Sequence, residues 1–286
     1  MSNDSSPIIE VRDVSFRYEG NDDAPPALDH VNLTIARGDF IAFAGQNGAG
    51  KTTLAKTFNG ILKPTEGQVI VDGHDTRTTS LDKLASFVGY CYQNPDHQIF
   101  STTVRDEVAF GPRNLGLSPQ EISEASERAL ELVGMLQDAD KYPFLLGRGE
   151  RQKLAVASII AMDSPVLVVD EPTTGLDLKG SLSIMDLLRQ WNADGRTIII
   201  ITHDMNIIAE YAKRTIVMAQ GHILIDGPTR EALTDPVSLA KAFLKPTQIT
   251  RLAQSLDGRY GFPQDIITVK EFKSALERRL NNSSGG

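Results

Sequence analysis

One stretch of the chain has the residue types and the spacing of a loop that binds phosphate. Residues 45 to 52 fit the pattern G-x-x-x-x-G-K-[ST], with a strand-like apolar segment before them and a helical pattern after them. Glycines let the backbone point successive N–H groups at phosphate oxygens, and the start of the next helix adds positive potential. We expect Lys51 to reach the β- and γ-phosphates of a nucleotide and Thr52 to ligate Mg²⁺. The nucleotide-binding residues predicted here are Gly45, Gln46, Asn47, Gly48, Ala49, Gly50, Lys51, Thr52 and Thr53.

A pair of acidic residues ends another apolar segment. Residues 166 to 169 are continuously apolar, and Asp170 and Glu171 follow them. Such a segment is typical of a strand buried on both faces of a parallel sheet, and α/β sheets bind ligands at the carboxyl ends of their strands. We expect Asp170 to support Mg²⁺ through water. Glu171 is then placed to polarise the attacking water as a general base.

Alternating strands and helices must hold these two motifs. The alternation predicts an α/β fold, a mostly parallel sheet with helices on both faces. Strand-like segments before residue 73 predict an antiparallel β subdomain beside it. The expected strands of the main sheet span residues 40–43, 87–92, 166–170, 197–202, 214–218 and 222–226. The expected helices span residues 51–62, 81–86, 118–136, 149–161, 180–191 and 205–211.

Composition limits the classes of function. The 286 residues are 41% hydrophobic and 23% charged, which is typical of a soluble globular protein. No apolar run approaches the ~18 residues that a membrane-spanning helix needs, so work at a membrane would require another chain. The net charge of −8 disfavours broad nucleic-acid binding, which depends on phosphate neutralisation. Cys91 is the only cysteine, which excludes an intrachain disulfide and fits a reducing compartment.

Further motifs accompany the two halves of the nucleotide site in a fixed order. Gln93 follows a predicted strand, residues 146 to 152 precede the acidic strand, residues 174 to 177 follow it, and His203 ends the next apolar strand. In this order and spacing, residues 8 to 230 resemble the nucleotide-binding domain of ABC (ATP-binding cassette) proteins, which has a P-loop NTPase fold. The resemblance implies hydrolysis of ATP with Mg²⁺ as the metal ion.

The same resemblance assigns roles to particular residues. The implied catalytic residues are Glu171, His203 (switch histidine), Gln93 (Q-loop) and Lys51. The implied Mg²⁺ site contains Thr52, Gln93 and Asp170, and Asp177 is the implied D-loop residue. The signature segment, which would contact the ATP of a partner, contains Gly147, Arg148, Gly149 and Glu150.

The resemblance also implies a head-to-tail dimer with two ATP molecules at its interface. Each ATP would lie between the phosphate loop of one subunit and the signature helix of the other. Tyr18 is placed like the A-loop aromatic that stacks on adenine, with Phe16 as the other candidate. An ordinary strand aromatic is the alternative interpretation of Tyr18.

Three segments are expected along the chain. Residues 8–230 form the ATPase domain, with a helical insertion at about 93–160. Residues 231–280 form a small C-terminal α-rich extension that, by the same resemblance, contributes to dimerisation. Residues 281–286 are expected to be disordered.

A narrower resemblance follows Gln93. Residues 93–100, 103–112 and 114–117 are similar to the ATPases of energy-coupling factor (ECF) transporters, importers of vitamins and of cobalt or nickel. The resemblance implies a groove for the coupling helices of an integral-membrane subunit. It also implies a substrate-binding membrane subunit and a peripheral location at the cytoplasmic face of the membrane. His97 with Asp96 supplies too few ligands for a metal site, so we interpret that pair as part of a solvated loop.

The signature departs from the family pattern. Gly147 stands where serine is expected, and Arg148 stands where the first of two glycines is expected. Two hypotheses follow: a competent variant signature, or a heterodimer in which this chain completes a weak site. The wider alternatives are an exporter subunit, a soluble assembly factor, the weakly catalytic half of a heterodimer, or a non-catalytic, degenerate half used only for assembly.

Overall fold

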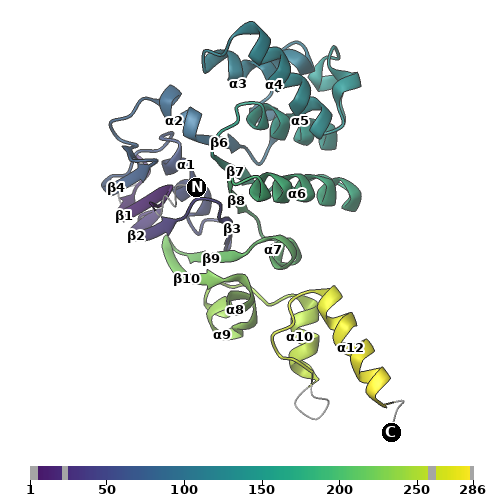
Figure 1. Cartoon of the computed structure of the whole chain (residues 1–286). Coiled ribbons are helices and arrows are strands. Elements are labelled where there is room, and N and C mark those ends of the chain that lie inside the picture. Colours follow the sequence, from purple (N-terminus) through teal and green to yellow (C-terminus); the bar gives the residue numbers. More distant parts are fainter. Residues whose placement is uncertain (1–5, 21–24, 257–261, 284–286) are drawn as a thin grey trace.

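The computed structural model describes residues 6–20, 25–256 and 262–283. Two sheets form the body of the protein, and helices lie around the larger one (Figure 1). The fold is therefore the expected α/β fold with an antiparallel subdomain. The smaller, four-stranded sheet is antiparallel and has the order β2-β1-β4-β5. Its strands are β1 (Ile9–Phe16), β2 (Leu28–Ile35), β4 (Glu66–Val71) and β5 (His74–Asp75).

The larger sheet has six strands in the order β10-β9-β3-β8-β7-β6. Its strands are β3 (Phe40–Ala44), β6 (Val88–Cys91), β7 (Val166–Asp170), β8 (Thr197–Ile201), β9 (Arg214–Ala219) and β10 (His222–Pro228). All pairs are parallel except β9 with β10. Every residue of β3, β7 and β8 is buried, which explains why these segments are apolar without alternation.

Helices cover the sheet and form the expected insertion. The helices beside the sheets are α1 (Lys51–Phe58), α2 (Leu81–Phe87), α6 (Leu178–Ala193) and α7 (Met205–Tyr211). The insertion contains α3 (Val104–Asn114), α4 (Pro119–Leu132) and α5 (Arg148–Ile160), which group together beyond β6 (Figure 1). Three short 3₁₀ helices join them, η1 (Pro95–His97), η2 (Leu136–Asp138) and η3 (Pro143–Leu145). Within the described residues, none of the helices is both long and apolar enough to cross a bilayer.

Two helix expectations were wrong. The first helix ends at Phe58 instead of Leu62, because Gly60 turns the chain with a φ of +74° and packs against the side chain of Leu84. Helix α3 was not expected, since Gly111 and Pro112 lie within it. Thr103 begins α3 by accepting a hydrogen bond from the Asp106 N–H.

The C-terminal extension is helical and projects away from the sheets (Figure 1). It contains α10 (Gln248–Ser255) and α12 (Val269–Ser283), and α8 (Thr229–Thr234) and α9 (Pro236–Lys241) connect it to β10. Disorder was expected from residue 281, but the backbone of α12 continues to Ser283. Residues 284–286 of that expectation lie outside the described residues.

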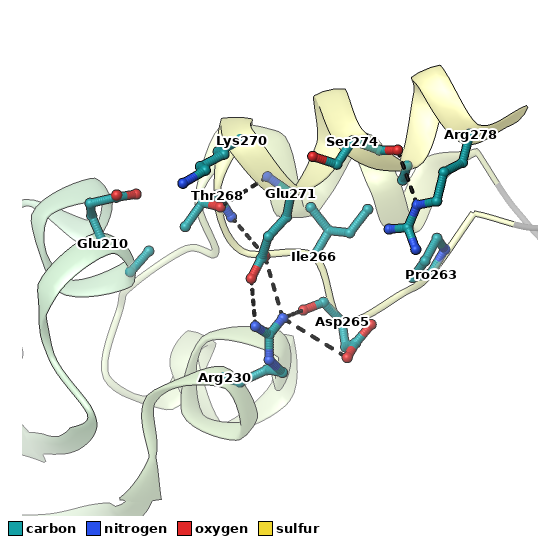
Figure 2. A pocket seen from close by; sticks show the side chains of 12 residues that line it. Glu210, Arg230, Pro263, Asp265, Ile266, Thr268, Lys270, Glu271, Ser274 and Arg278 are labelled. Carbon is teal, nitrogen blue, oxygen red and sulfur yellow. Dashed lines mark hydrogen bonds and ion pairs between the residues drawn. The ribbon is translucent and has the colours of Figure 1, made fainter. Parts of the chain in front are cut away.

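Arg230 ties the extension to the body, as Figure 2 shows. Its guanidinium donates to the Glu271 carboxylate at 2.5 and 3.3 Å and to the Asp265 carbonyl at 2.6 Å. Burial alone raises the pKa of Glu271, but hydrogen bonds from Arg230 and from two backbone N–H groups hold that pKa below 4.5. Because the folded pKa is lowered, the contact stabilises docking above the ordinary pKa and is lost as pH falls through the lowered value.

We predict that Arg230→Ala loosens α12. The substitution removes the ion pair and the hydrogen bond to Asp265, so the described part of α12 should exchange its backbone amide hydrogens faster with deuterated solvent. Arg278→Ala is the matched control, because Arg278 donates to the Ser274 carbonyl within its own helix. Unchanged protection of α12 in Arg230→Ala would contradict the role of this contact.

Candidate functional site

The phosphate loop lies between β3 and α1, and two of its glycines are required by close packing. Gly45 has a φ of +146°, and a Cβ there would lie 2.3 Å from the Met218 carbonyl oxygen. Gly50 has a φ of +100°, and a Cβ there would lie 2.6 Å from the Ala27 carbonyl oxygen. Side chains at either position would both clash and strain the backbone. The glycine spacing therefore fixes the path of the loop.

Lys51 is buried beneath this loop. Its Nζ donates to the carbonyl oxygens of Gly45 and Gln46 at 2.8 and 2.9 Å. Burial lowers the pKa of Lys51, and the nearby carboxylates of Glu171 and Asp170 oppose that shift. The ammonium group is thus held at the loop beside two acids, where an anionic polyphosphate can accept its hydrogen bonds.

Asp170 links β7 to the first turn of α1. Thr52 Oγ1 donates to Asp170 Oδ2 at 2.9 Å, and the Tyr90 hydroxyl donates to the same oxygen at 3.2 Å. Burial raises the pKa of Asp170, while the hydrogen bonds from Thr52 and Tyr90 counteract it. A hydroxyl and a carboxylate oxygen are ligands that suit Mg²⁺, which takes oxygen ligands from protein, phosphate and water. These two side chains fit the predicted metal site.

Tyr90 is a site residue that the sequence analysis missed. It lies on β6 opposite Val168 of the neighbouring strand β7, which points its hydroxyl at Asp170. Burial and the Asp170 carboxylate raise the pKa of Tyr90, so the phenol stays a neutral donor. The signal available was a tyrosine in a buried strand, since such a hydroxyl requires a hydrogen-bond partner.

Glu171 and His203 meet at the ends of β7 and β8. His203 Nδ1 lies 2.7 Å from Glu171 Oε1, and the Thr202 hydroxyl donates to Glu171 Oε2 at 3.2 Å. Glu171 has a φ of +51°, a left-handed conformation that is unfavourable for a side chain with a Cβ. Its N–H donates to the Ile201 carbonyl at 2.8 Å, which holds that conformation. The result is a nearly buried carboxylate with two partners, which can accept a proton from water at the open edge of the site.

Gln93 lies at the same edge and is exposed. It follows β6, whose Cys91 pairs with Val169 just before Asp170 and Glu171, so the predicted Q-loop is next to the acidic motif. The predicted Q-loop therefore begins at the end of the strand next to the one that carries the acidic motif.

Two contacts join the segment after Gln93 to the signature helix α5. Arg151 Nε donates to Asp96 Oδ1 at 2.7 Å, and Arg151 also donates to the Leu146 carbonyl at 2.5 Å. The Gln98 side chain donates to the Ala155 carbonyl at 2.9 Å. The sequence analysis included Arg151 and Gln98 in its motifs but gave neither residue a role of its own. Through them, the Q-loop segment and the signature are mechanically connected.

Of the two aromatic residues considered for stacking on adenine, Tyr18 is exposed and Phe16 is not. Tyr18 is 50% exposed, and its hydroxyl lies 3.0 Å from Thr53 Oγ1 on α1. Phe16 is buried in the core between the sheets and packs edge-on against Tyr18, with ring centroids 4.9 Å apart. Only an exposed ring offers a face for stacking, which favours Tyr18.

The signature forms a separate surface. Gly147 caps α5, and its N–H donates to the Glu150 carboxylate at 2.7 Å. The Asp177 carboxylate accepts from the Gly180 N–H at 2.7 Å and so caps α6. Between these helix starts lies a groove of about 540 Å³, lined by residues 147, 149, 150, 153, 175–177, 179, 180 and 183. Residues 45–52 are not among those that line it.

Comparison with known proteins agrees with this arrangement of motifs. The family model described as ABC transporter matches residues 28–174, which include the phosphate loop, Asp170 and Glu171. The chain belongs to the ABC transporter family.

Several relatives and solved structures resemble this ABC protein. The energy-coupling factor transporter ATP-binding protein EcfA of Methanocaldococcus jannaschii is 40% identical over 258 residues, covering 90% of the chain and 91% of the relative. The structure of cbiO1 from Clostridium perfringens, described as part of the ABC transporter complex cbiONQ, has a TM-score of 0.73 at 33% identity and covers 91% of the chain and 100% of that structure. A dimeric structure of the ATP-binding cassette MJ0796 bound to ADP and Pi has a TM-score of 0.71 at 27% identity. It covers 77% of the chain and 98% of that structure.

Some relatives are longer than this chain. The chain spans about half the length of the first curated relatives it matches, 46% of a putative ABC transporter ATP-binding protein from Caldanaerobacter subterraneus. That relative is 45% identical over 271 residues, which are 95% of the chain.

We predict that Asp170→Asn weakens Mg²⁺ binding more than nucleotide binding. The amide keeps the shape of the side chain but removes the charge that holds the metal. The Mg²⁺ concentration that gives half of the maximal Mg²⁺-dependent nucleotide binding should therefore rise. Tyr90→Phe is the matched control, because it keeps the carboxylate and removes one of its donors. Tyr90→Phe should therefore raise the required Mg²⁺ concentration less than Asp170→Asn does, although loss of an outer partner can itself cost about 10–100-fold in metal affinity. Equal Mg²⁺ dependence of Asp170→Asn and the parent protein in a fluorescent-nucleotide titration would contradict this assignment.

Proposed function

We propose that this protein is the ATP-hydrolysing subunit of an ECF-type ABC importer. The observation that carries the proposal is the convergence of Lys51, Thr52, Asp170, Glu171 and His203 at one edge of the parallel sheet. These side chains cover the three requirements of phosphoryl transfer to water, namely phosphate binding, metal support and a base for the nucleophile.

The proposed chemistry follows from this geometry. Lys51 and the loop N–H groups bind the β- and γ-phosphates, and Tyr18 stacks on the adenine. Bound by Thr52, Asp170 and Gln93, Mg²⁺ would neutralise phosphate charge. Glu171 accepts a proton as the oxygen of water bonds to the γ-phosphorus, and the bond from that phosphorus to the ADP oxygen breaks to give ADP and phosphate. His203 and Thr202 position the Glu171 carboxylate during this step.

A second ATPase subunit, identical or homologous, completes the site in this proposal. The separation of the signature groove from the phosphate loop in one chain supports it, as does the dimeric cassette similar in fold. ATP binding would bring two subunits together head to tail, with the start of α5 of each subunit on the ATP of the other. Hydrolysis would reopen the dimer. Asp177 begins α6 beside the same groove, where the D-loop would contact the partner.

Membrane partners receive this motion through the insertion. Phe100 and Phe110 are 60% and 42% exposed and pack edge-on, with ring centroids 4.6 Å apart. They lie in the segment that Asp96 and Arg151 connect to α5, so opening and closing of the dimer would move them. The similarity to one EcfA protein and to a component of the cbiONQ transporter complex supports an integral-membrane coupling subunit and a substrate-binding membrane subunit. The protein would lie at the cytoplasmic face of the membrane, and the cargo would be a vitamin or a transition-metal ion.

The role of Glu171 predicts a variant that binds ATP but hardly turns it over. Glu171→Gln should keep nucleotide affinity, because the amide is isosteric, and should slow hydrolysis by roughly 10²–10⁴-fold through loss of the base. Glu131→Gln, an exposed change on α4, serves as the control for an isosteric loss of one negative charge. Phosphate release by Glu171→Gln at close to the parent rate would refute the assignment.

The coupling surface predicts loss of assembly without loss of nucleotide binding. Phe100→Ser together with Phe110→Ser should prevent co-purification of this subunit with its membrane partners, because exposed aromatic rings supply much of the contact area of interfaces. Leu81→Ser is the control, since Leu81 is 56% exposed but lies on α2. A doubly substituted protein that still co-purifies in parent amounts would exclude this surface from the interface.

A further inference from the structure

Gln152 is a buried amide without a hydrogen-bond partner. It lies on α5 and is fully buried, and neither its Nε2 nor its Oε1 meets a partner within residues 6–20, 25–256 and 262–280. In the same residues, Thr76 contributes the one other buried side-chain oxygen or nitrogen of this kind. An amide that is removed from water without a partner costs free energy, and buried side-chain amides are normally paired. The unpaired amide therefore requires an explanation.

Packing of α5 does not explain a glutamine at this position. The other buried residues of the helix are apolar apart from Ser158, whose hydroxyl donates to the Leu154 carbonyl at 3.0 Å. An apolar side chain of the same length, such as methionine, would fill nearly the same volume without burying an amide. The polar group of Gln152 is thus retained against the interest of the core around it.

The face of α5 that carries Gln152 meets the loop between β7 and α6. Residues three positions apart share a helix face, and long helical side chains lean toward the N-terminal end of their helix. Gly149 lies three positions before Gln152. A Cβ built on Gly149 would lie 3.0 Å from Leu176 Cδ2 and 3.9 Å from the Gly175 carbonyl oxygen. This geometry directs the Gln152 side chain toward the loop of residues 171–177.

That loop has functional residues at both ends and polar groups between them. Glu171 begins it with a φ of +51°, and Asp177 ends it as the cap of α6. Two internal hydrogen bonds shape it, from the Thr174 N–H to the Glu171 carbonyl and from the Leu176 N–H to the Thr173 carbonyl, each of 3.2 Å. Within the part of the chain that the structure describes, the hydroxyls of Thr173 and Thr174 have no hydrogen-bond partner. A hydroxyl both donates and accepts, so it can pair with either end of an amide.

We propose that Gln152 is a positioning residue for hydrolysis, and that its amide pairs with the 172–176 loop when MgATP is bound. The pairing fixes the loop and, through the Thr174 hydrogen bond to the Glu171 carbonyl, the position of the Glu171 carboxylate. This inference rests on the proposed role of Glu171 as the base and adds a residue of α5 that sets its position. The amide contributes nothing to the binding of ATP at the phosphate loop. Its free-energy cost is offset only in the arrangement that hydrolyses ATP.

Gln152→Met separates this role from a role in folding. Methionine removes the unpaired amide at nearly constant volume, so the full chain without nucleotide should unfold at the parent temperature or above it. At saturating MgATP, and at a protein concentration where the rate per subunit is constant, kcat should fall by about tenfold, the effect of one lost hydrogen bond. KM for ATP should change by less than about twofold, because ground-state binding does not use the amide.

Two further variants make the result specific. Ser158→Ala removes a buried hydroxyl from the same helix, where that hydroxyl bonds only to the backbone of α5, and it should leave kcat at the parent value. Gln152→Met combined with Glu171→Gln should be little slower than Glu171→Gln alone in single-turnover hydrolysis. The two losses should not add, because Gln152 acts through Glu171.

The outcomes separate this inference from the proposed function. A parent-like kcat in Gln152→Met overturns the inference. A lower unfolding temperature overturns it too, since the amide would then be paired in the protein without nucleotide. A full tenfold loss on top of Glu171→Gln excludes action through Glu171. If Glu171→Gln alone hydrolyses ATP at close to the parent rate, the proposed base is wrong and this inference fails with it.

Discussion

The whole site depends on parallel pairing of three buried strands. In the register of the sheet, Phe43 of β3 and Asp170 of β7 both pair with Ile201 of β8, so the three strands end at one level. The residues proposed to carry the chemistry follow these ends: the phosphate loop after β3, Glu171 after β7, and Thr202 with His203 after β8. A shift of any strand would separate the carboxylates from Lys51 and Thr52. The register of these buried, largely apolar strands therefore sets the positions of the polar residues that follow them.

Burial at this edge of the sheet shifts the pKa values of the groups that the strands bring together. It lowers the pKa of Lys51 and raises the pKa of Asp170, and each group is the other's nearby opposite charge. Glu171 is held in a left-handed conformation by a backbone hydrogen bond to β8, and its carboxylate is held by His203 and Thr202. The rigid sheet thus stabilises a locally unfavourable conformation at a functional position.

Sequence patterns predicted the parts of this site that depend on local spacing. The phosphate loop, the acidic strand end and His203 each follow an apolar strand, and strand ends in a parallel sheet converge whatever the details of packing. Contacts between distant side chains were not predictable in this way. The Tyr90 hydrogen bond to Asp170 and the Arg151 ion pair with Asp96 depend on side-chain rotamers and on segments far apart in sequence. Helix α3 was missed because Gly111 and Pro112 weaken its pattern, although tertiary packing in the insertion stabilises it.

The signature extends this account from one chain to two. Its groove is lined by no residue of the phosphate loop, and the Gly147 N–H is satisfied by the Glu150 carboxylate. The central claim is that hydrolysis requires two subunits. The most direct test is the ATPase rate per subunit measured over a wide range of protein concentration at saturating MgATP. The account predicts that this rate rises with concentration and then reaches a plateau, as monomers give way to dimers. A rate per subunit that is constant and substantial down to the lowest concentrations would contradict it.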